Sequence, residues 1–422
     1  MEKSKGITLA LSTGKREAPY DALILDAVLR QSLVSVRSLG RQGLRVAASE
    51  TNEHRSVPTF SSHWCRQKIV CPAREGTEHY LTYLKQILDR TETPVVIASS
   101  DGTIALLRKH RRELERQTSI ALAQEPALAI AVDKEQTLRV AQQLGIAVPP
   151  SIAVRAMDDV AAAIHEIGLP VVIKPAESWV ESGQEGARFG STLAGTLAEA
   201  QAAVEKPLDL GGNMLFQPFL SGRREAVSFL YAKGVMYASF AQWAKRTEPQ
   251  LGGTSVLRQS IALPDDISDQ ARRLVCEIDL EGYSEVEFRR NSAGKPYLME
   301  INPRLSASVE IAVRSGVDFP YLLYRWAHGD TLEPVRDYRK GQWMRYLKGD
   351  FFTTLEAIQQ PGRAGVPPAR EAVQDFLTSF FVPMNYDYVD WQDMKPAFVS
   401  MADFIQNRVS KGIIRKLSLI GR

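Results

Sequence analysis

A short segment near residue 300 constrains the fold more than any other feature of the chain. Residues 285–304 read EVEFRRNSAGKPYLMEINPR, in which two apolar runs flank the turn residues NSAG, and this pattern predicts a β-hairpin. If Ala293 and Gly294 form a two-residue loop, Glu287 lies directly opposite Glu300. Because side chains alternate along strands, both carboxylates share one face with Asn302. The other face then carries Val286, Phe288, Met299 and Ile301.

The facing glutamates raise an electrostatic question. Like charges directly opposed across two strands, with Cβ atoms roughly 5 Å apart, destabilise a sheet unless a cation lies between them. Two carboxylates and the amide oxygen of Asn302 are hard donors, and proteins usually complete such a Mg²⁺ site with phosphate oxygens and water. Arg304, just beyond, would meet an anion. The alternative is a hairpin whose two glutamates point into water.

Length and composition restrict the classes of protein to which the chain can belong. A chain of 422 residues with 44% hydrophobic residues is expected to form two or three domains of mixed α/β character. A net charge of +3 gives no global basis for nucleic-acid binding. Three cysteines form neither a disulfide framework nor a metal-ligand spacing. No apolar run approaches the ~18 residues of a membrane span and no signal-peptide core is visible, so we expect a cytoplasmic protein.

The first hundred or so residues alternate strands and helices. Residues 21–27 predict a buried strand, 32–43 a helix that ends at glycine, and 44–49 a second strand, and 93–114 repeat strand, turn and helix. This order predicts an open parallel sheet, although no GxGxxG follows the first strand. Asp101 follows a strand end, where such sheets place ligands, but an N-cap of the next helix is the favoured interpretation.

A second unit begins near residue 133. Asp133 predicts the N-cap of a helix through Leu144, with Lys134 in its first turn, where a cation is unfavourable unless an anion lies nearby. Residues 169–175, LPVVIKP, predict a buried strand carrying Lys174, which needs a partner. A polar segment with Gly183, Gly186 and Gly190 follows, and its backbone N–H groups could close over phosphates. The alternatives are a solvated lysine and an ordinary connection.

The remaining chain predicts strands, then helices, then a looser end. Residues 196–205 open with a capping box, 213–222 form an apolar strand, two further strands follow, and 268–279 form a helix before the hairpin. Residues 306–316 and 319–329 predict two amphipathic helices with glycine stops. From about residue 338 the pattern loosens, and the chain ends in a basic amphipathic tail.

Five separated elements resemble, in order, the ATP-grasp superfamily, closest to its carbamoyl-phosphate synthase and biotin carboxylase branch. They are Lys134, VVIKP, the glycine loop, LFQPFL and EVEF…YLMEINPR, and the resemblance covers about residues 21–330. It implies an α/β fold, α+β in part, with an N-terminal open parallel-sheet domain before a two-lobed ATP-grasp domain. We expect a leader at 1–20, the first domain at 21–128, the ATP-grasp domain at 129–335 with its lid at about 170–215, and a C-terminal extension at 336–422.

The resemblance also implies roles for individual residues. Lys134 and Lys174 match the lysines that hold the ATP phosphates, and the glycine loop with Gly183 and Gly186 matches the mobile lid. Arg304 matches the arginine that stabilises the transferring phosphoryl group or the substrate anion. The hinge that meets adenine is implied at Gln217, Pro218, Phe219 and Leu220, the ribose contact at Glu225, and the sites of one or two Mg²⁺ (or Mn²⁺) ions at Glu287, Glu300 and Asn302.

Four positions depart from the family pattern. Gln217 replaces the usual hinge acid, and Glu225 follows two arginines, so its alignment is open to a shift of one residue. Glu285 stands where the D-alanine ligase branch has an arginine, which argues against that branch. Trp179 in the lid is bulkier than the pattern usually has, and either stacks on a substrate or packs the lid.

Near the expected acceptor, Lys245, Arg246 and Arg258 either bind a carboxylate or acyl phosphate or are simply solvated.

The function implied is a ligase that activates a carboxylate with ATP as an acyl phosphate and joins it to an amine. Its expected partners are small-molecule acids and amines, and no nucleic acid. One alternative is bicarbonate activation, as in the carboxylase branch, and another is a non-catalytic ATP-binding sensor or scaffold. The sequence does not specify the oligomeric state, and a homodimer is compatible with it.

The basic tail admits two interpretations. Its cations lie among apolar residues, which would suit contact with an anionic membrane surface. Amphipathic helices of this kind more often pack on their own domain, and that is the interpretation we favour. The cations concerned are Arg408, Lys411, Arg415, Lys416 and Arg422.

Overall fold

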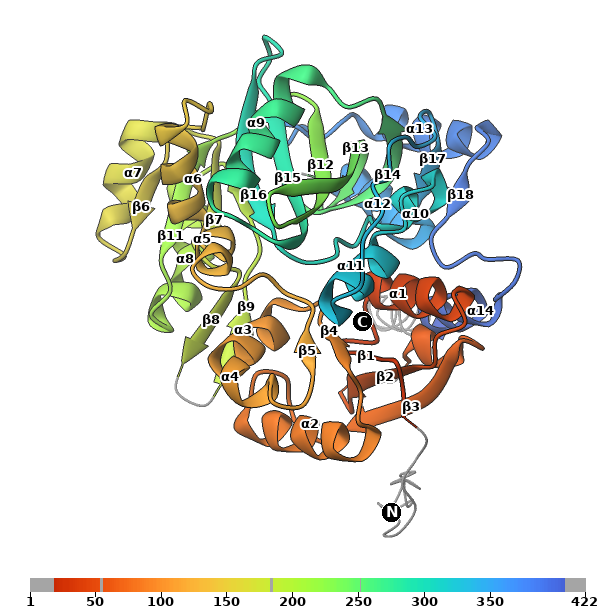
Figure 1. Ribbon diagram of the computed structural model, residues 1–422. Helices are drawn as coiled ribbons and strands as arrows, with labels where there is room; N and C mark the ends of the chain where they lie inside the picture. The colour runs from red at the N-terminus through yellow and green to blue at the C-terminus, as the bar shows by residue number, and fades with distance from the viewer. Residues whose placement is uncertain (1–18, 54–55, 183–184, 251, 407–422) are drawn as a thin grey trace, which may run out of the picture.

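The computed structural model describes residues 19–53, 56–182, 185–250 and 252–406. In these ranges the chain forms an N-terminal parallel sheet, a small antiparallel lobe and a large sheet that is antiparallel except for its last strand pair, covered by helices (Figure 1). This is the α/β architecture, α+β in part, that the sequence predicted. The basic tail from Arg408 onward lies outside the described residues, so its predicted packing stays a prediction.

The N-terminal sheet has the strand order β3-β2-β1-β4-β5, and every pairing in it is parallel. Its central strands β1 and β4 form where the sequence runs apolar without alternation, because helices bury both faces, whereas buried and exposed residues alternate along the edge strand β3. The strands are β1 (Ala22–Ile24), β2 (Val46–Thr51), β3 (Cys65–Cys71), β4 (Val95–Ile97) and β5 (Ser119–Ile120). The accompanying helices are α1 (Arg30–Arg41), the 3₁₀ turn η1 (Pro58–Ser61), α2 (Glu78–Thr91), α3 (Asp101–Lys109) and α4 (Arg111–Leu114).

The small lobe follows helices α5 (Ala127–Val132) and α6 (Lys134–Gln143). As predicted, Asp133 caps α6 by accepting hydrogen bonds from the backbone N–H groups of Glu135 and Gln136. The lobe has the strand order β10-β7-β11-β6 with helices packed on it. These elements are β6 (Ile152–Val154), α7 (Asp159–Ile167), β7 (Val171–Pro175), β10 (Thr192–Ala194), α8 (Leu197–Asp209) and β11 (Met214–Pro218).

The predicted glycine loop is more ordered than expected. It pairs with itself as a two-stranded antiparallel hairpin of β8 (Trp179–Ser182) and β9 (Glu185–Arg188). We call β8, β9 and their connections the lid. In Figure 1 it lies beside the N-terminal sheet domain, against α3.

The large sheet has the order β16-β15-β12-β13-β14-β17-β18. Its strands are β12 (Arg224–Ala232), β13 (Val235–Glu248), β14 (Thr254–Ile261), β15 (Gly282–Arg290), β16 (Pro296–Asn302), β17 (Trp343–Arg345) and β18 (Asn385–Tyr386). The last two come from the region expected as a C-terminal extension, so that region completes the sheet. The domain boundaries drawn from the sequence stay predictions.

The other helices cover this sheet and join it to the N-terminal domain (Figure 1). The expected helix at 306–316 is shorter than predicted, because residues 307–309 form a turn before it begins at residue 310. These elements are α9 (Asp265–Glu277), α10 (Glu310–Ser315), α11 (Phe319–His328), α12 (Leu347–Gln359), α13 (Ala369–Thr378), the 3₁₀ turn η2 (Ser379–Phe381) and α14 (Lys395–Phe404).

The hairpin of β15 and β16 has the predicted register at its centre and a different one near its turn. Glu287 pairs with Glu300, but the register shifts immediately after them, so Phe288 pairs with Leu298. The predicted two-residue loop is therefore wrong, and Met299 is the extra residue of a β-bulge. Leu298, not Met299, joins the buried core; its backbone N–H donates to the carbonyl of Ala147.

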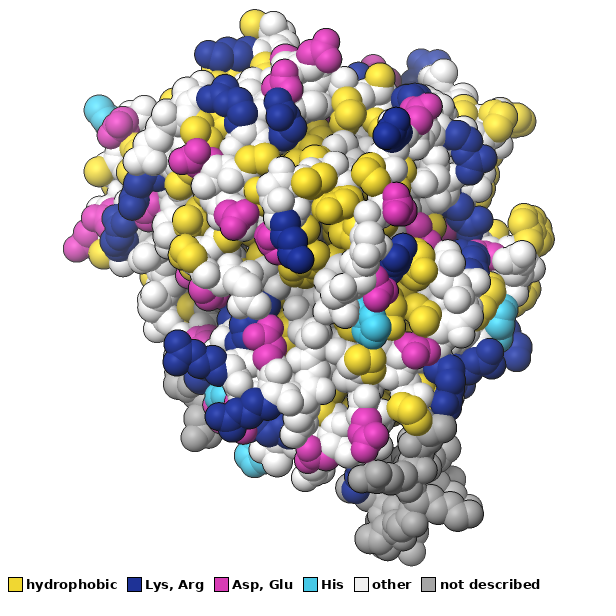
Figure 2. All heavy atoms as spheres, in the orientation of Figure 1, with side chains coloured by type: hydrophobic (Ala, Val, Ile, Leu, Met, Phe, Trp, Pro, Cys, Tyr) yellow, Lys and Arg dark blue, Asp and Glu magenta, His cyan; other side chains and the backbone are white. Residues whose placement is uncertain are grey.

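No described helix is both long and apolar enough to cross a bilayer. On the face drawn in Figure 2, cationic and acidic side chains are interspersed, and neither sign covers it continuously. For that face, this agrees with the near-neutral composition.

Candidate functional site

Two glutamates lie at the centre of the site, on the face of the large sheet that turns toward the lid. Glu287 and Glu300 are directly paired, and the Asn302 amide donates to Glu287 Oε1 at 3.2 Å. Glu287 is buried, whereas the Glu300 side chain is 26% exposed. The three predicted metal ligands thus come together.

The protein itself supplies cations to both carboxylates. Arg224 donates to both oxygens of Glu287, at 3.0 and 2.5 Å, and Lys134 Nζ lies 3.6 Å from Glu300 Oε2. Burial acts to raise the pKa of Glu300, but the charges of Lys134 and Lys174 lower it below its ordinary value. The facing glutamates are therefore tolerated without a metal. A metal at this site is indicated only by the chemistry of the oxygen donors of Glu287, Glu300 and Asn302.

The donor set fits a hard divalent cation that is only partly held by protein. Two carboxylates and one amide oxygen suit Mg²⁺, which keeps several water or phosphate ligands. Among the described residues, no three histidine, cysteine, aspartate or glutamate side chains converge on one point. A metal at Glu287, Glu300 and Asn302 would thus need oxygens from a bound phosphate.

Lys174 lies beside this pair, on β7 of the small lobe. Its side chain is buried and its Nζ is 3.7 Å from the Met299 sulfur, which the bulge turns toward the site. Burial lowers the pKa of Lys174 to about 8, although Glu300 opposes that effect. A buried ammonium with so weak a partner is suited to bind an anion such as phosphate.

The hinge segment 217–220 lines a small cavity of about 60 Å³ next to Lys174. Gln217 is buried and donates to the Ser151 hydroxyl at 2.9 Å, while Pro218, Phe219 and Leu220 form the cavity wall. All four predicted hinge residues therefore lie on the same side of Lys174 and Glu300.

A second small cavity, of about 50 Å³, lies on the other side of Glu300, beside Arg304. Arg304 Nε donates to Asp101 at 2.7 Å, and Arg188 of the lid donates to the same carboxylate at 2.8 Å. The expectation that Asp101 caps its helix is wrong, because Ser100 occupies the N-cap and Asp101 is the first residue of α3. Burial would raise the pKa of Asp101, but the two arginines hold it well below the ordinary value.

Trp179 seats the lid on the N-terminal domain. A Cβ atom added at Gly76, Gly102 or Gly186 would lie 2.7, 2.6 or 2.2 Å from its indole ring, so only glycine allows this close contact. Of the interpretations weighed for Trp179, the structure shows packing of the lid. Gly186, expected at the phosphates, here packs on the indole, and Gly183 lies outside the described residues. Because ligand pockets are usually about 300–1,000 Å³, neither small cavity by itself is large enough for a nucleotide.

Three predicted residues are not brought into this group. Arg258 is fully buried and donates to both oxygens of Asp387, at 2.9 and 2.7 Å, and it lines neither of the two small cavities. Glu225 is on the opposite face of β12 and pairs with Arg290 and Arg223. Lys245 pairs with Asp375 at 2.7 Å, in a larger cavity described below.

The residue that sequence reasoning missed is Arg224, which binds Glu287. The signal was present in the strand alternation: Ala226 pairs with Glu287, so Arg224 shares the site face and Glu225 does not. The ribose contact implied at Glu225 stays a prediction. Glu285 is also buried on this face, where burial and the charge of Glu287 raise its pKa to about 7.

Comparison with known proteins agrees with this geometry. A family model described as "ATP-grasp in the biosynthetic pathway with Ter operon" matches residues 212–349, and one described as the carbamoyl-phosphate synthase L chain ATP-binding domain matches residues 133–226. The D-alanine–D-alanine ligase of Saccharophagus degradans is 26% identical over 212 residues, covering 47% of this chain and 64% of that protein. The corresponding ligase of Desulfotalea psychrophila is 29% identical over 181 residues, covering 38% and 53%. The chain therefore spans about half to two thirds of the length of these relatives.

Solved structures share the fold. The biotin carboxylase domain of Hydrogenobacter thermophilus 2-oxoglutarate carboxylase has a TM-score of 0.61 at 14% identity, covering 77% of this chain and 73% of that one. The L-amino acid ligase of Bacillus licheniformis has a TM-score of 0.57 at 16% identity, covering 76% of each chain. One family model agrees with the branch expected from the sequence, whereas the two D-alanine–D-alanine ligases belong to the branch that Glu285 argued against. The carbamoyl-phosphate synthase model matches the segment that contains Lys134, Lys174 and the hinge. The chain belongs to the ATP-grasp superfamily.

Proposed function

We propose that this protein is a magnesium-dependent carboxylate–amine ligase that releases ADP and phosphate. The observation that carries the proposal is the convergence of Lys134, Lys174, Glu300 and Arg304 on two adjoining cavities that the lid covers. Its sequence relatives are named as ligases of two amino acids, which supports the same class of reaction here.

In the proposed reaction, a carboxylate oxygen of the substrate attacks the γ-phosphorus of ATP, and ADP leaves. The amine then attacks the carbonyl carbon of the acyl phosphate, phosphate leaves with its bonding electrons, and the amine loses a proton to form the amide. No side-chain nucleophile takes part. A magnesium ion, when bound, supplies positive charge that stabilises the transferring phosphoryl group.

The chain's own residues position and protect this chemistry. Lys134 and Lys174 approach from two different elements, and in this proposal both bind phosphate oxygens of ATP. Arg304, held by Asp101, is placed to bind the anion on the far side of Glu300. The lid, seated through Trp179, excludes the water that would hydrolyse an acyl phosphate.

The test is to supply MgATP with arrayed carboxylic acids and amines, and to score ADP and AMP separately. ADP release that requires one acid and one amine, with formation of their amide, supports the proposal. AMP release contradicts it. ADP release driven by bicarbonate alone would support the carboxylase alternative, and nucleotide binding without ADP formation across the panel would support a sensor.

A further inference from the structure

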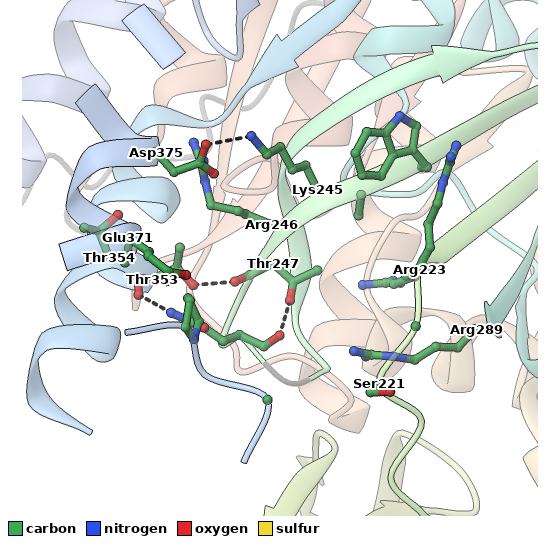
Figure 3. Close-up of a pocket in the computed structure, with 18 of the residues that line it drawn as sticks. Ser221, Arg223, Lys245, Arg246, Thr247, Arg289, Thr353, Thr354, Glu371 and Asp375 are labelled. Carbon is green, nitrogen blue, oxygen red and sulfur yellow. Dashed lines mark hydrogen bonds and ion pairs between the residues drawn. The ribbon is translucent and has the colours of Figure 1, made fainter. Parts of the chain in front are cut away.

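A cavity much larger than the two at the nucleotide site lies between the large sheet and the C-terminal helices. Its volume is about 660 Å³, within the range of small-molecule sites. One wall is formed by the ends of β12, β13 and β15, and the other by α12 and α13, as Figure 3 shows. Arg224 and Arg289 line both this cavity and the hinge cavity, so the two adjoin.

The wall formed by the helices lies almost entirely outside the family matches. The match that extends furthest ends at residue 349, whereas α13 begins at Ala369. Lys134, Lys174 and Glu300 therefore lie within the family matches, whereas the helical residues that line this cavity lie outside them. A specificity site of this chain would be expected where such a wall meets the shared site.

Cations outnumber acids among the residues that line the cavity. Its lining includes five cationic side chains, Arg223, Arg224, Lys245, Arg246 and Arg289, and two acidic ones, Glu371 and Asp375. Four of the cations are paired with carboxylates. Lys245 and Arg246 bind Asp375, Arg224 binds Glu287, and Arg223 lies 3.1 Å from Glu225.

Arg289 is the exception. Within the described part of the chain it has no carboxylate partner, and its Nε is buried without a hydrogen bond. Its guanidinium lies 5.5 Å from the Phe219 ring, and Figure 3 shows the side chain extending into the cavity. Burial, and then the charge of Arg224, lower the pKa of Arg289 to about 10, so it remains a cation at neutral pH. A partly buried guanidinium of this kind is stabilised by a bidentate anion.

We propose that this cavity binds the acid to be activated, and that this acid carries a second anionic group, a carboxylate, which Arg289 holds. The inference rests on the proposed ligase function and names the class of its substrate. The distal carboxylate binds Arg289, while the reacting one lies toward Arg224 and Glu287, at the edge of the nucleotide site. Occupation of Glu287 by a metal would release Arg224 to meet the reacting carboxylate.

The experiment compares acids that differ in one charge, using the full chain. Glutarate is titrated against butyrate, and L-glutamate against L-glutamine, by calorimetry in the presence of Mg²⁺ and a non-hydrolysable ATP analogue. The variants are Arg289→Gln, which removes the anchor, and Thr378→Trp, which fills the cavity from α13 without changing a charge. Arg116→Gln, at an exposed position of the N-terminal domain, is the matched control.

We expect the wild type and the control to bind the dicarboxylates about tenfold or more tightly than their monocarboxylate counterparts. Arg289→Gln abolishes that preference, and Thr378→Trp weakens all four acids while nucleotide affinity stays as in the wild type. An unchanged preference in Arg289→Gln overturns the proposal, as does failure of the wild type to bind either dicarboxylate at millimolar concentration. If the wild type binds the acids but not the nucleotide, the ligase proposal fails and the acid site stands.

Discussion

Glu300→Gln tests the nucleotide site most directly, because it removes one charge and keeps the side-chain volume. Glu300 faces Glu287 across the hairpin and lies 3.6 Å from Lys134, with Lys174 beside it. We expect the variant to fold and to bind nucleotide, but to lose turnover. Removal of one group that stabilises transition-state charge typically costs about 10²–10³ in rate.

The cost in stability follows from the same contacts. In the variant, Lys174 can lose its proton. Because its pKa is about 8, deprotonation at pH 7 costs about 1.4 kcal/mol. Loss of the attraction between Lys174 and Glu300 therefore destabilises the variant by no more than that amount. The pair with Lys134 is partly solvated, since Glu300 is 26% exposed, and contributes up to about 1 kcal/mol. Relief of repulsion with Glu287 offsets part of this. The total is about 2 kcal/mol or less, a fall of a few degrees in Tm.

The measurements are ADP release in a coupled assay and thermal unfolding, at several Mg²⁺ concentrations. Glu277→Gln, at an exposed position of α9, is the matched control and should behave as the wild type in both. ADP release by Glu300→Gln within about threefold of the wild type would refute the assignment, since a lost metal ligand costs more. A collapse of the fold would instead refute the stability estimate.

Three further outcomes follow from the structure. Nucleotide binding at pH 8.5 should be accompanied by proton uptake, because Lys174 is neutral in about three quarters of the molecules at that pH and a bound anion favours its charged form. Calorimetry in buffers of different ionisation enthalpy measures this uptake, and Lys174→Arg should show none. Trp179→Ala should detach the lid from the N-terminal domain, which raises ATP hydrolysis without amide formation and exposes residues 180–190 to protease, with little change in Tm. If every ATP hydrolysed by this variant still yields an amide, the lid does not have the proposed role. Asp387→Ala leaves the fully buried Arg258 without its counter-ion and should cost about 3–5 kcal/mol in chemical denaturation, whereas a loss below about 1 kcal/mol would show that water replaces the carboxylate.

The sequence predicted those parts of the site that depend on local pattern. The pairing of Glu287 with Glu300 followed from strand alternation and turn residues, and the cap at Asp133 followed from residue type. The bulge at Met299 could not be predicted in this way. Its neighbour Leu298 turns its N–H toward Ala147, a partner far away in the chain that no local rule identifies.

Long-range ion pairs account for the other differences. Arg258 reads as a free cation until the fold brings Asp387 to it. The facing glutamates do not by themselves demand a metal, because the fold brings Arg224 from a neighbouring strand to Glu287 and Lys134 from a helix to Glu300. Residue types identified the chemistry of the site, but only the tertiary structure shows which charges the protein already satisfies.

The late position of β17 and β18 in the chain has a consequence for synthesis on the ribosome. Strand β14 leaves the exit tunnel long before β17, its outer neighbour, has been translated, so a nascent chain carries an uncovered sheet edge. Arg258 on that strand also waits for Asp387, which is added only when translation is almost complete. A prematurely terminated product would thus be an aggregation-prone species, and not a smaller folded protein.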